Sequence, residues 1–203
     1  MRSLDIIPPI AWVDNYPFDY KSMKSYYEDL FSYENLKNKR YQPTQTGDAI
    51  TSYMSNDTKQ PHKQEHNKDF NTWLNNQLLD IFLNVYGYQV DFTRLIVTNS
   101  WSNKNKRGGK TQPHHHKTAD WVVNSYLNVP KNSGKLILHP PNIDNNFGYE
   151  PRRIDVQTND VVVFPAWLIH ETEKSESDED RVTMSYNIKI DIASNDIMAS
   201  YLV

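Results

Sequence analysis

Two stretches in the first third of the chain carry apolar residues at helical spacing. In residues 18–33 the apolar and aromatic positions follow an i, i+3, i+4, i+7, i+8 pattern, at Met23, Tyr26, Tyr27, Leu30 and Phe31. Residues 69–88 hold a second such stripe, at Phe70, Trp73, Leu74, Leu78, Ile81, Phe82 and Val85. This period places the apolar side chains along one face of a helix. We therefore predict two amphipathic helices. Residues 40–68, between them, are rich in Gln, Asn, Lys, Thr and Asp, which predicts a surface loop with a short strand at 49–54.

From about residue 93 the period of the pattern changes to two. Six short segments have the composition of strands and are separated by Gly, Pro, Asn and Asp: 92–101, 121–130, 134–141, 152–157, 160–170 and 181–190. No helical pattern intervenes, which disfavours parallel strands joined by helices. The pattern therefore predicts a mainly β fold with N-terminal helices, in which an antiparallel sandwich or jelly roll packs on those helices.

Length and composition bound the organisation and the chemistry of the protein. The 203 residues are expected to form one domain, with 1–92 as a helical and loop support region and 93–192 as the β core. The absence of cysteine excludes disulfides, thiolate metal ligands and thiol nucleophiles. A net charge of -3 gives no broad attraction to nucleic acid. No apolar run approaches the ~20 residues of a membrane helix, and residues 1–12 lack a signal-peptide pattern, so we expect a cytoplasmic protein.

Three consecutive histidines, His114, His115 and His116, precede the strand at 121–130. Because side chains alternate along a strand, His114 and His116 would share a face and could bind one metal ion. His170 ends the apolar segment 160–170, and an antiparallel sheet can bring it close to that pair as a third ligand. Exposed polar histidines without a ligand role explain the same residues. Asp120 is an alternative acidic ligand in place of His116, provided that the chain bends between them.

Polar side chains follow one face of two further predicted strands. Arg181, Thr183, Ser185 and Asn187 alternate along 181–190, and Asn124, Tyr126 and Asn128 alternate along 121–130. If these faces line the interior, Arg181 can pair bidentately with a carboxylate, and Tyr126 can add its hydroxyl. Asn128 and Asn187 share these faces and are further candidate cofactor contacts. A solvent-exposed polar face is the competing interpretation. Three tryptophans near these motifs are assigned to the core, although they could border the pocket: Trp101, Trp121 and Trp167.

The ordered elements H-x-H, SYLNVP, Gly-x-Leu, FPAWLIH and DRVTMSYN resemble the iron(II)- and 2-oxoglutarate-dependent oxygenases. They are most similar to the oxygenase group common in bacteriophages and some bacteria, from Trp101 to Asn187. The resemblance implies a double-stranded β-helix, with Fe(II) at His114, His116 and His170. It also implies 2-oxoglutarate at Arg181 and Tyr126, with O2 as oxidant. Most of the superfamily has Asp or Glu where His116 stands, so the resemblance implies an unusual three-histidine iron site.

The resemblance implies hydroxylation of a substrate that the sequence leaves open as a small molecule, a protein or a nucleotide. No catalytic residue is required beyond the metal site. The basic run at 104–110 is a single loop, so we expect no nucleic-acid or membrane partner; a phage protein would act in the host cytoplasm. Two alternatives stay open: a metal-binding cupin that does not use oxoglutarate, and a catalytically silent phage interaction domain.

Overall fold

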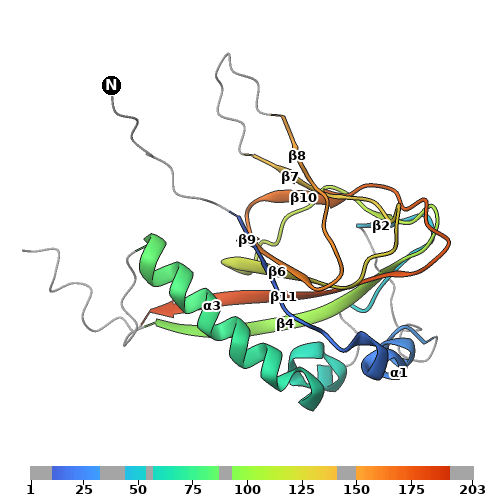
Figure 1. The fold of residues 1–203 in the computed structure, drawn as a ribbon. Coiled ribbons are helices and arrows are strands. Elements are labelled where there is room, and N and C mark those ends of the chain that lie inside the picture. The colour runs from blue at the N-terminus through green and yellow to red at the C-terminus, as the bar shows by residue number, and fades with distance from the viewer. Residues whose placement is uncertain (1–10, 33–43, 54–56, 87–92, 141–149, 193–203) are drawn as a thin grey trace, which may run out of the picture.

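The computed structural model describes residues 11–32, 44–53, 57–86, 93–140 and 150–192. Two antiparallel sheets face one another, and the helices lie on the outer face of the larger sheet (Figure 1). The larger sheet has the order β1-β9-β6-β11-β4-β3, and the smaller has the order β10-β7-β8. A two-stranded ribbon, β2-β5, accompanies them. This is the mainly β, double-stranded β-helix architecture that the sequence predicts.

The two longest strands, β11 and β4, are neighbours in the larger sheet. That sheet contains β1 (Trp12–Asn15), β9 (Asp160–Pro165), β6 (Trp121–Asn128), β11 (Arg181–Ile192), β4 (Thr93–Asn105) and β3 (Ala49–Thr51). The smaller sheet contains β10 (Ile169–Thr172), β7 (Leu136–His139) and β8 (Arg152–Ile154). The ribbon pairs β2 (Gln45–Thr46) with β5 (Lys110–Thr111). Every described strand pair is antiparallel.

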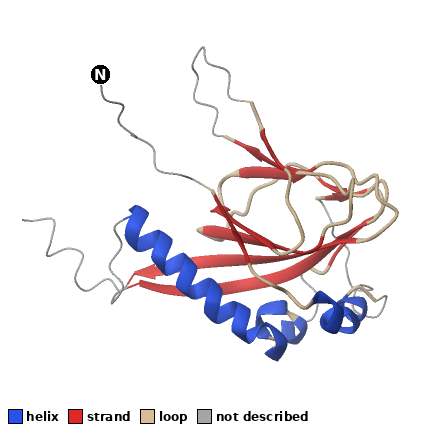
Figure 2. Cartoon of the chain, viewed as in Figure 1, coloured by secondary structure: helices blue, strands red, loops and turns tan. Residues whose placement is uncertain are grey.

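Both predicted helices are present and cover the larger sheet (Figure 2). They are α1 (Tyr20–Leu30), whose first turn is capped by the Asp19 side chain, and α3 (Lys68–Tyr86). Three 3-10 turns lie between them: η1 (Asp57–Lys59), η2 (Pro61–Lys63) and η3 (Glu65–Asn67). The apolar stripes of the helices pack on the face of the sheet that carries Val182, Met184, Tyr186 and Ile188. Alternation along β11 therefore turns its polar residues toward the space between the two sheets.

The space between the sheets holds a second, smaller apolar cluster. Tyr126 and Phe164 from the larger sheet meet Leu136 and Leu138 from the smaller one. A cavity adjoins this cluster, because Tyr126 and Leu136 also line it, and the polar face of β11 forms another part of its lining. The fold thus separates an apolar layer under the helices from a cavity between the sheets, which polar residues of β11 help to line.

The structure changes three details of the sequence prediction. The predicted strand 160–170 is two strands in different sheets, because the chain turns after Pro165, where Leu168 N–H bonds back to its carbonyl. The short strands β1, β2 and β5 were not predicted. The described parts of residues 40–68 contain the predicted short strand as β3, and they also contain β2 and the three 3-10 turns, which were not predicted. The division into 1–92 and 93–192 stays a prediction.

Among the described residues, no helix has the length and apolar character needed to cross a bilayer.

Candidate metal centre and adjoining cavity

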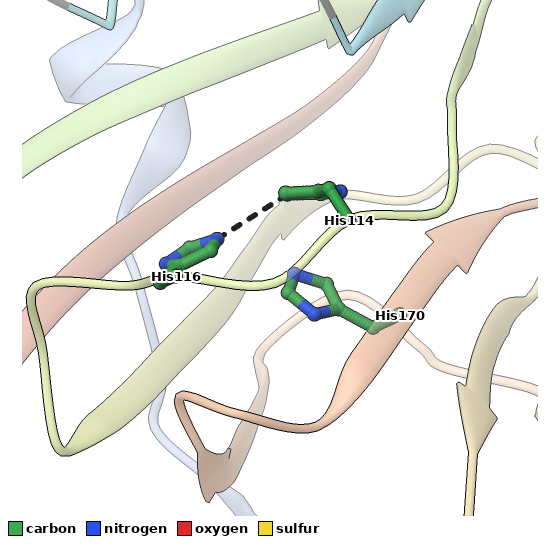
Figure 3. A group of neighbouring side chains, drawn as sticks. All are labelled: His114, His116 and His170. Carbon is green, nitrogen blue, oxygen red and sulfur yellow. Dashed lines mark hydrogen bonds between the residues drawn. The ribbon is translucent and has the colours of Figure 1, made fainter.

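The three predicted histidine ligands converge at one point between the sheets (Figure 3). His114 and His116 lie on an extended segment that leads into β6, and His170 lies on β10. This segment is not the regular strand that the alternation argument assumed. It is held instead by a single β-bridge, in which His114 and His170 exchange both main-chain hydrogen bonds, at 3.0 and 2.9 Å. The candidate ligand atoms of the three side chains all lie within 4.8 Å of one another.

Each imidazole ring has its Nδ1 beside an oxygen that can only accept a hydrogen bond. His114 Nδ1 lies 2.8 Å from the Gln112 carbonyl, and His170 Nδ1 lies 3.0 Å from the Leu168 carbonyl. His116 Nδ1 donates to the side-chain oxygen of Asn187 at 2.6 Å. A neutral ring with its proton on Nδ1 keeps a free lone pair on Nε2. This pattern, with one ring nitrogen tied to an oxygen, is typical of metal-binding histidines.

The donor atoms fit a divalent metal ion on two grounds. First, the Nε2 atoms of His114 and His116 lie 3.2 Å apart (Figure 3), which brings two lone pairs together and favours a cation between them. Second, burial lowers the pKa of His116 to about 4 and the pKa of His170 well below its ordinary value. The rings are therefore neutral near pH 7, as metal ligation requires. Neutral imidazoles suit Fe, Zn, Cu and Ni.

A cavity of about 320 Å³ extends from the histidines between the sheets. Arg181 lines it and is almost fully buried, with 1% of its surface exposed. Its Nη1 donates to the Ser133 carbonyl at 3.4 Å, but Nε and Nη2 find no partner within the described part of the chain. Its guanidinium also lies over the Tyr126 ring, 5.3 Å from the centroid. A buried cation with open N–H donors is suited to binding an anion in the cavity.

The second predicted cavity residue, Tyr126, is fully buried beside Arg181. Burial raises the pKa of its hydroxyl to about 12, although the neighbouring guanidinium opposes the shift. The hydroxyl therefore keeps its proton at ordinary pH and can donate a hydrogen bond. Together the two side chains present donors, and no negative charge, at one end of the cavity.

Residues 99–187 match the family model described as "Putative 2OG-Fe(II) oxygenase". This part of the chain is therefore similar to the 2OG-Fe(II) oxygenases. This confirms the resemblance read from the sequence, and the family implies Fe(II), 2-oxoglutarate and O2 as cofactors. The phage association of that resemblance stays a prediction. No curated protein matches the sequence.

Solved structures of oxygenases share the fold at low sequence identity. A Pseudomonas putida prolyl-4-hydroxylase superposes with a TM-score of 0.57 at 10% identity, over 88% of this chain and 91% of that one. A Trichoplax adhaerens prolyl hydroxylase, solved with a hypoxia inducible factor peptide, gives 0.56 at 14% identity, over 94% and 86%. HygX from Streptomyces hygroscopicus, solved with nickel, 2-oxoglutarate and hygromycin B, gives 0.53 at 11% identity, over 88% and 82%. At these identities the likeness concerns the fold.

Two of the predicted site residues, Asn128 and Asp120, lie away from the site, and a third, Asn187, has another contact than the one predicted. The Asn128 amide donates to the Asp180 carbonyl at 2.7 Å and does not line the cavity. The cause is a register shift between β6 and β11, which pairs Asn128 with Val182, on the face that meets the helices. The Asp120 carboxylate accepts the Ile190 N–H at 2.8 Å and is not part of the histidine group. Asn187 does line the cavity, but its oxygen accepts from His116.

Aromatic residues form one wall of the cavity beside the histidines. The Trp101 ring lies 5.4 Å from that of His116, and Tyr53 meets Trp101 edge to face at 4.9 Å. The sequence assigned Trp101 to the core; it is buried, but it also lines the cavity, as Tyr53 does. Trp121 is in the core as predicted, whereas Trp167 is 53% exposed, so its core assignment is wrong. Alternation along β4 could have placed Trp101 on the cavity face, but nothing in the sequence indicated the role of Tyr53.

The basic run at 104–110 is paired with the acidic segment that precedes β11. Arg107 forms a two-pronged contact with Asp178, at 2.6 and 2.8 Å. Lys104 lies 3.9 Å from Asp180, and the remaining contact joins Lys110 to Glu171 at 4.0 Å. These pairings offset part of the positive charge of this loop.

Proposed function

We propose that the protein is an oxygenase that uses Fe(II), 2-oxoglutarate and O2 to hydroxylate an organic substrate. The observation that carries this proposal is the presence, in one cavity, of two complementary groups. One is the set of three neutral imidazoles with converging Nε2 atoms, and the other is the buried guanidinium with open N–H donors. A cofactor that both chelates a metal and carries a second carboxylate at its far end matches this pair.

The residues divide into two binding roles under this proposal. His114, His116 and His170 would hold Fe(II), and three neutral ligands would leave the full +2 charge of the ion. Dianionic 2-oxoglutarate would balance that charge, with one carboxylate near the metal and the other at Arg181. Tyr126 would donate its hydroxyl to the same distal carboxylate, since its proton is retained at neutral pH. This charge balance makes a protein carboxylate ligand unnecessary.

Fe(II) held by the three histidines would supply the oxidising chemistry of the family, in which 2-oxoglutarate and O2 yield succinate, CO2 and an oxygen atom for a substrate C–H bond. The chain contributes binding, orientation and shielding from water. No side chain needs to act as a general acid or base. The cavity agrees with this, because the charged side chains that line it besides Arg181 are Lys117 and Glu171.

The aromatic wall of the cavity bears on the class of substrate. The wall formed by Trp101 and Tyr53 stands next to the metal ligands and offers aromatic surface and a hydroxyl. We propose that the reacting part of the substrate is uncharged and packs on this wall. A peptide or a small molecule is consistent with the names of the structural neighbours, which include prolyl hydroxylases and a protein solved with hygromycin B.

The test is an anaerobic titration of the purified protein with Fe(II) and then with 2-oxoglutarate. We expect a weak visible charge-transfer band that requires both additions. The His170→Ala variant should bind no iron, and Arg181→Ala should bind iron but show a much weakened band. Iron binding by the wild-type protein without any band would favour the cupin alternative. An absence of metal binding would contradict the proposal altogether and favour an interaction domain.

A further inference from the structure

The three candidate ligands differ in how their rings are held. His114 and His170 each donate from Nδ1 to a main-chain carbonyl two residues earlier, those of Gln112 and Leu168. These acceptors are part of the same local segment as the ring, so they do not depend on any side chain. His116 alone uses a side chain, Asn187, from a different strand. The orientation of His116 therefore depends on one residue that is 71 positions away in the sequence.

The main chain does not hold the His116 ring in the same way, because the equivalent carbonyl is directed at β10. Two residues before His116 stands His114, whose carbonyl accepts the His170 N–H at 2.9 Å in the β-bridge. That hydrogen bond ties the H-x-H segment to β10 and so holds the other two ligands together. The N–H of His116 itself donates to the Ala166 carbonyl at 2.8 Å, which fixes its backbone but not its ring. The acceptor that holds the ring is instead the Asn187 side chain.

The fold places Asn187 for this contact. It lies on β11 with 3% of its surface exposed, on the face that lines the cavity. The register between β11 and β4 shifts directly after it, since Asn187 pairs with Asn99 and Ile188 with Val97. Thr98 is the extra residue in this bulge, and its hydroxyl donates to the Asn187 carbonyl at 3.3 Å. Bulges of this kind redirect side chains beside functional sites.

We propose that Asn187 is a positioning residue that holds the His116 ring with its proton on Nδ1 and its Nε2 toward the metal. This inference rests on the proposed function and deepens it. It explains how the ring of His116 is oriented as a metal ligand, at a position where most relatives are expected to carry a carboxylate. Asn187 is thereby moved from the cofactor contacts that the sequence suggested to the support of a metal ligand. Such supporting residues typically change metal affinity 10–100-fold when they are lost.

The first test compares Co(II) binding, as a visible stand-in for Fe(II), in the wild-type protein and two variants. Asn187→Ala should raise the Kd for Co(II) about 10–100-fold. Asn187→Asp keeps an acceptor oxygen and should restore affinity to within a few-fold of wild type. The matched control is Asn124→Ala, which removes another side-chain amide that lines the same cavity. The oxygen of that amide accepts from Ser185 at 2.8 Å, and among the described residues no ligand histidine uses Asn124 as its Nδ1 acceptor, so its loss should leave the Kd for Co(II) unchanged.

The second test needs no variant and no metal. In the ¹⁵N-labelled apoprotein, long-range ¹H–¹⁵N correlations of the His116 ring should show the proton on Nδ1, and in Asn187→Ala this preference should be lost. A wild-type ring with its proton on Nε2, or equal Co(II) affinity in wild type and Asn187→Ala, would overturn the positioning role alone. Failure of the wild-type protein to bind Co(II) at all would overturn the proposed metal site together with this inference.

Discussion

The guanidinium of Arg181 is enclosed by the cavity wall, yet its Nε and Nη2 have no hydrogen-bond partner among the described residues. Burying a charge without a full set of partners destabilises a fold, because the solvation that it loses is not replaced. Burial accordingly lowers the pKa of Arg181, and Tyr126 only partly opposes this effect. An unfavourable group of this kind is retained when a ligand completes its contacts.

Replacing Arg181 by an apolar residue of similar length should therefore stabilise the apoprotein and, at the same time, abolish 2-oxoglutarate binding. We expect Arg181→Met to raise the free energy of unfolding of the apoprotein by about 1 kcal/mol or more. The same variant should lose measurable 2-oxoglutarate binding in the Fe(II)-loaded protein, because no cation faces the distal carboxylate. Chemical denaturation and calorimetric titration would measure the two effects. Arg181→Lys is the control, since it keeps the charge and should show no gain in stability. A large loss of stability in Arg181→Met would contradict the assignment.

The buried histidines make the stability of the apoprotein depend on pH. The pKa of His116 is about 4 in the folded protein and about 6.5 in an unfolded chain. Between these values the unfolded chain binds more protons, so stability falls as pH decreases from about 6.5 toward 4. One such group contributes at most about 1.4 kcal/mol per pH unit. Urea denaturation of the metal-free protein at pH 7 and pH 5 should show this loss. His116→Gln should show a smaller loss, and an equal loss in that variant would show that other groups are responsible.

At the scale of elements, α3 stabilises the larger sheet from the face opposite to the metal centre. Phe82 is fully buried in this contact, with its ring 5.1 Å from that of Trp121. Phe82→Ala should cost about 3–5 kcal/mol of unfolding free energy, because it removes a large buried ring and leaves a cavity. Denaturation curves would measure the cost. The Kd for Co(II) should stay unchanged in the fraction that remains folded, and a large change would mean that the helix also shapes the site.

Elements whose pattern is local were predictable from the sequence. The apolar stripe of α3 and the alternation along β11 both depend only on period, and both were confirmed. Asn128 was misplaced because a bulge between β6 and β11 changes the parity of the strand, and a bulge leaves no mark on the apolar pattern. The contact of Asn187 with His116 was missed for a related reason. It depends on tertiary placement, which residue type and period do not encode.

The turn that splits residues 160–170 shows a different limit. The segment DVVVFPAWLIH is apolar throughout, which is typical of one buried strand. In the structure it leaves the larger sheet after Pro165 and enters the smaller sheet at Ile169. Proline marks the change of direction, but only the closure of the two sheets makes the turn necessary. Because the chain passes from β9 to β10 at this turn, His170 lies in the smaller sheet, beside the other two candidate ligands.

At the scale of the whole molecule, the proposed metal would join the two sheets. His170 belongs to the smaller sheet, and His116 is tied through Asn187 to the larger one. In the described residues, the H-x-H segment is attached to the smaller sheet by its single bridge to His170. A metal ion that binds only the folded arrangement stabilises it by RT ln(1 + [M]/Kd), which is about 2.7 kcal/mol at one hundred times the Kd.

This linkage predicts a localised change in hydrogen exchange. With Co(II) at one hundred times its Kd, exchange of the His114 and His170 amides should slow by up to about a hundredfold, because the ion opposes opening of the bridge between them. Amides in the middle of α3, which lies beyond the larger sheet, should slow much less unless they exchange only by global unfolding. Addition of a chelator should restore the original rates. Equal slowing throughout the molecule would show that the metal opposes only global unfolding, and would contradict a local bridge between the sheets.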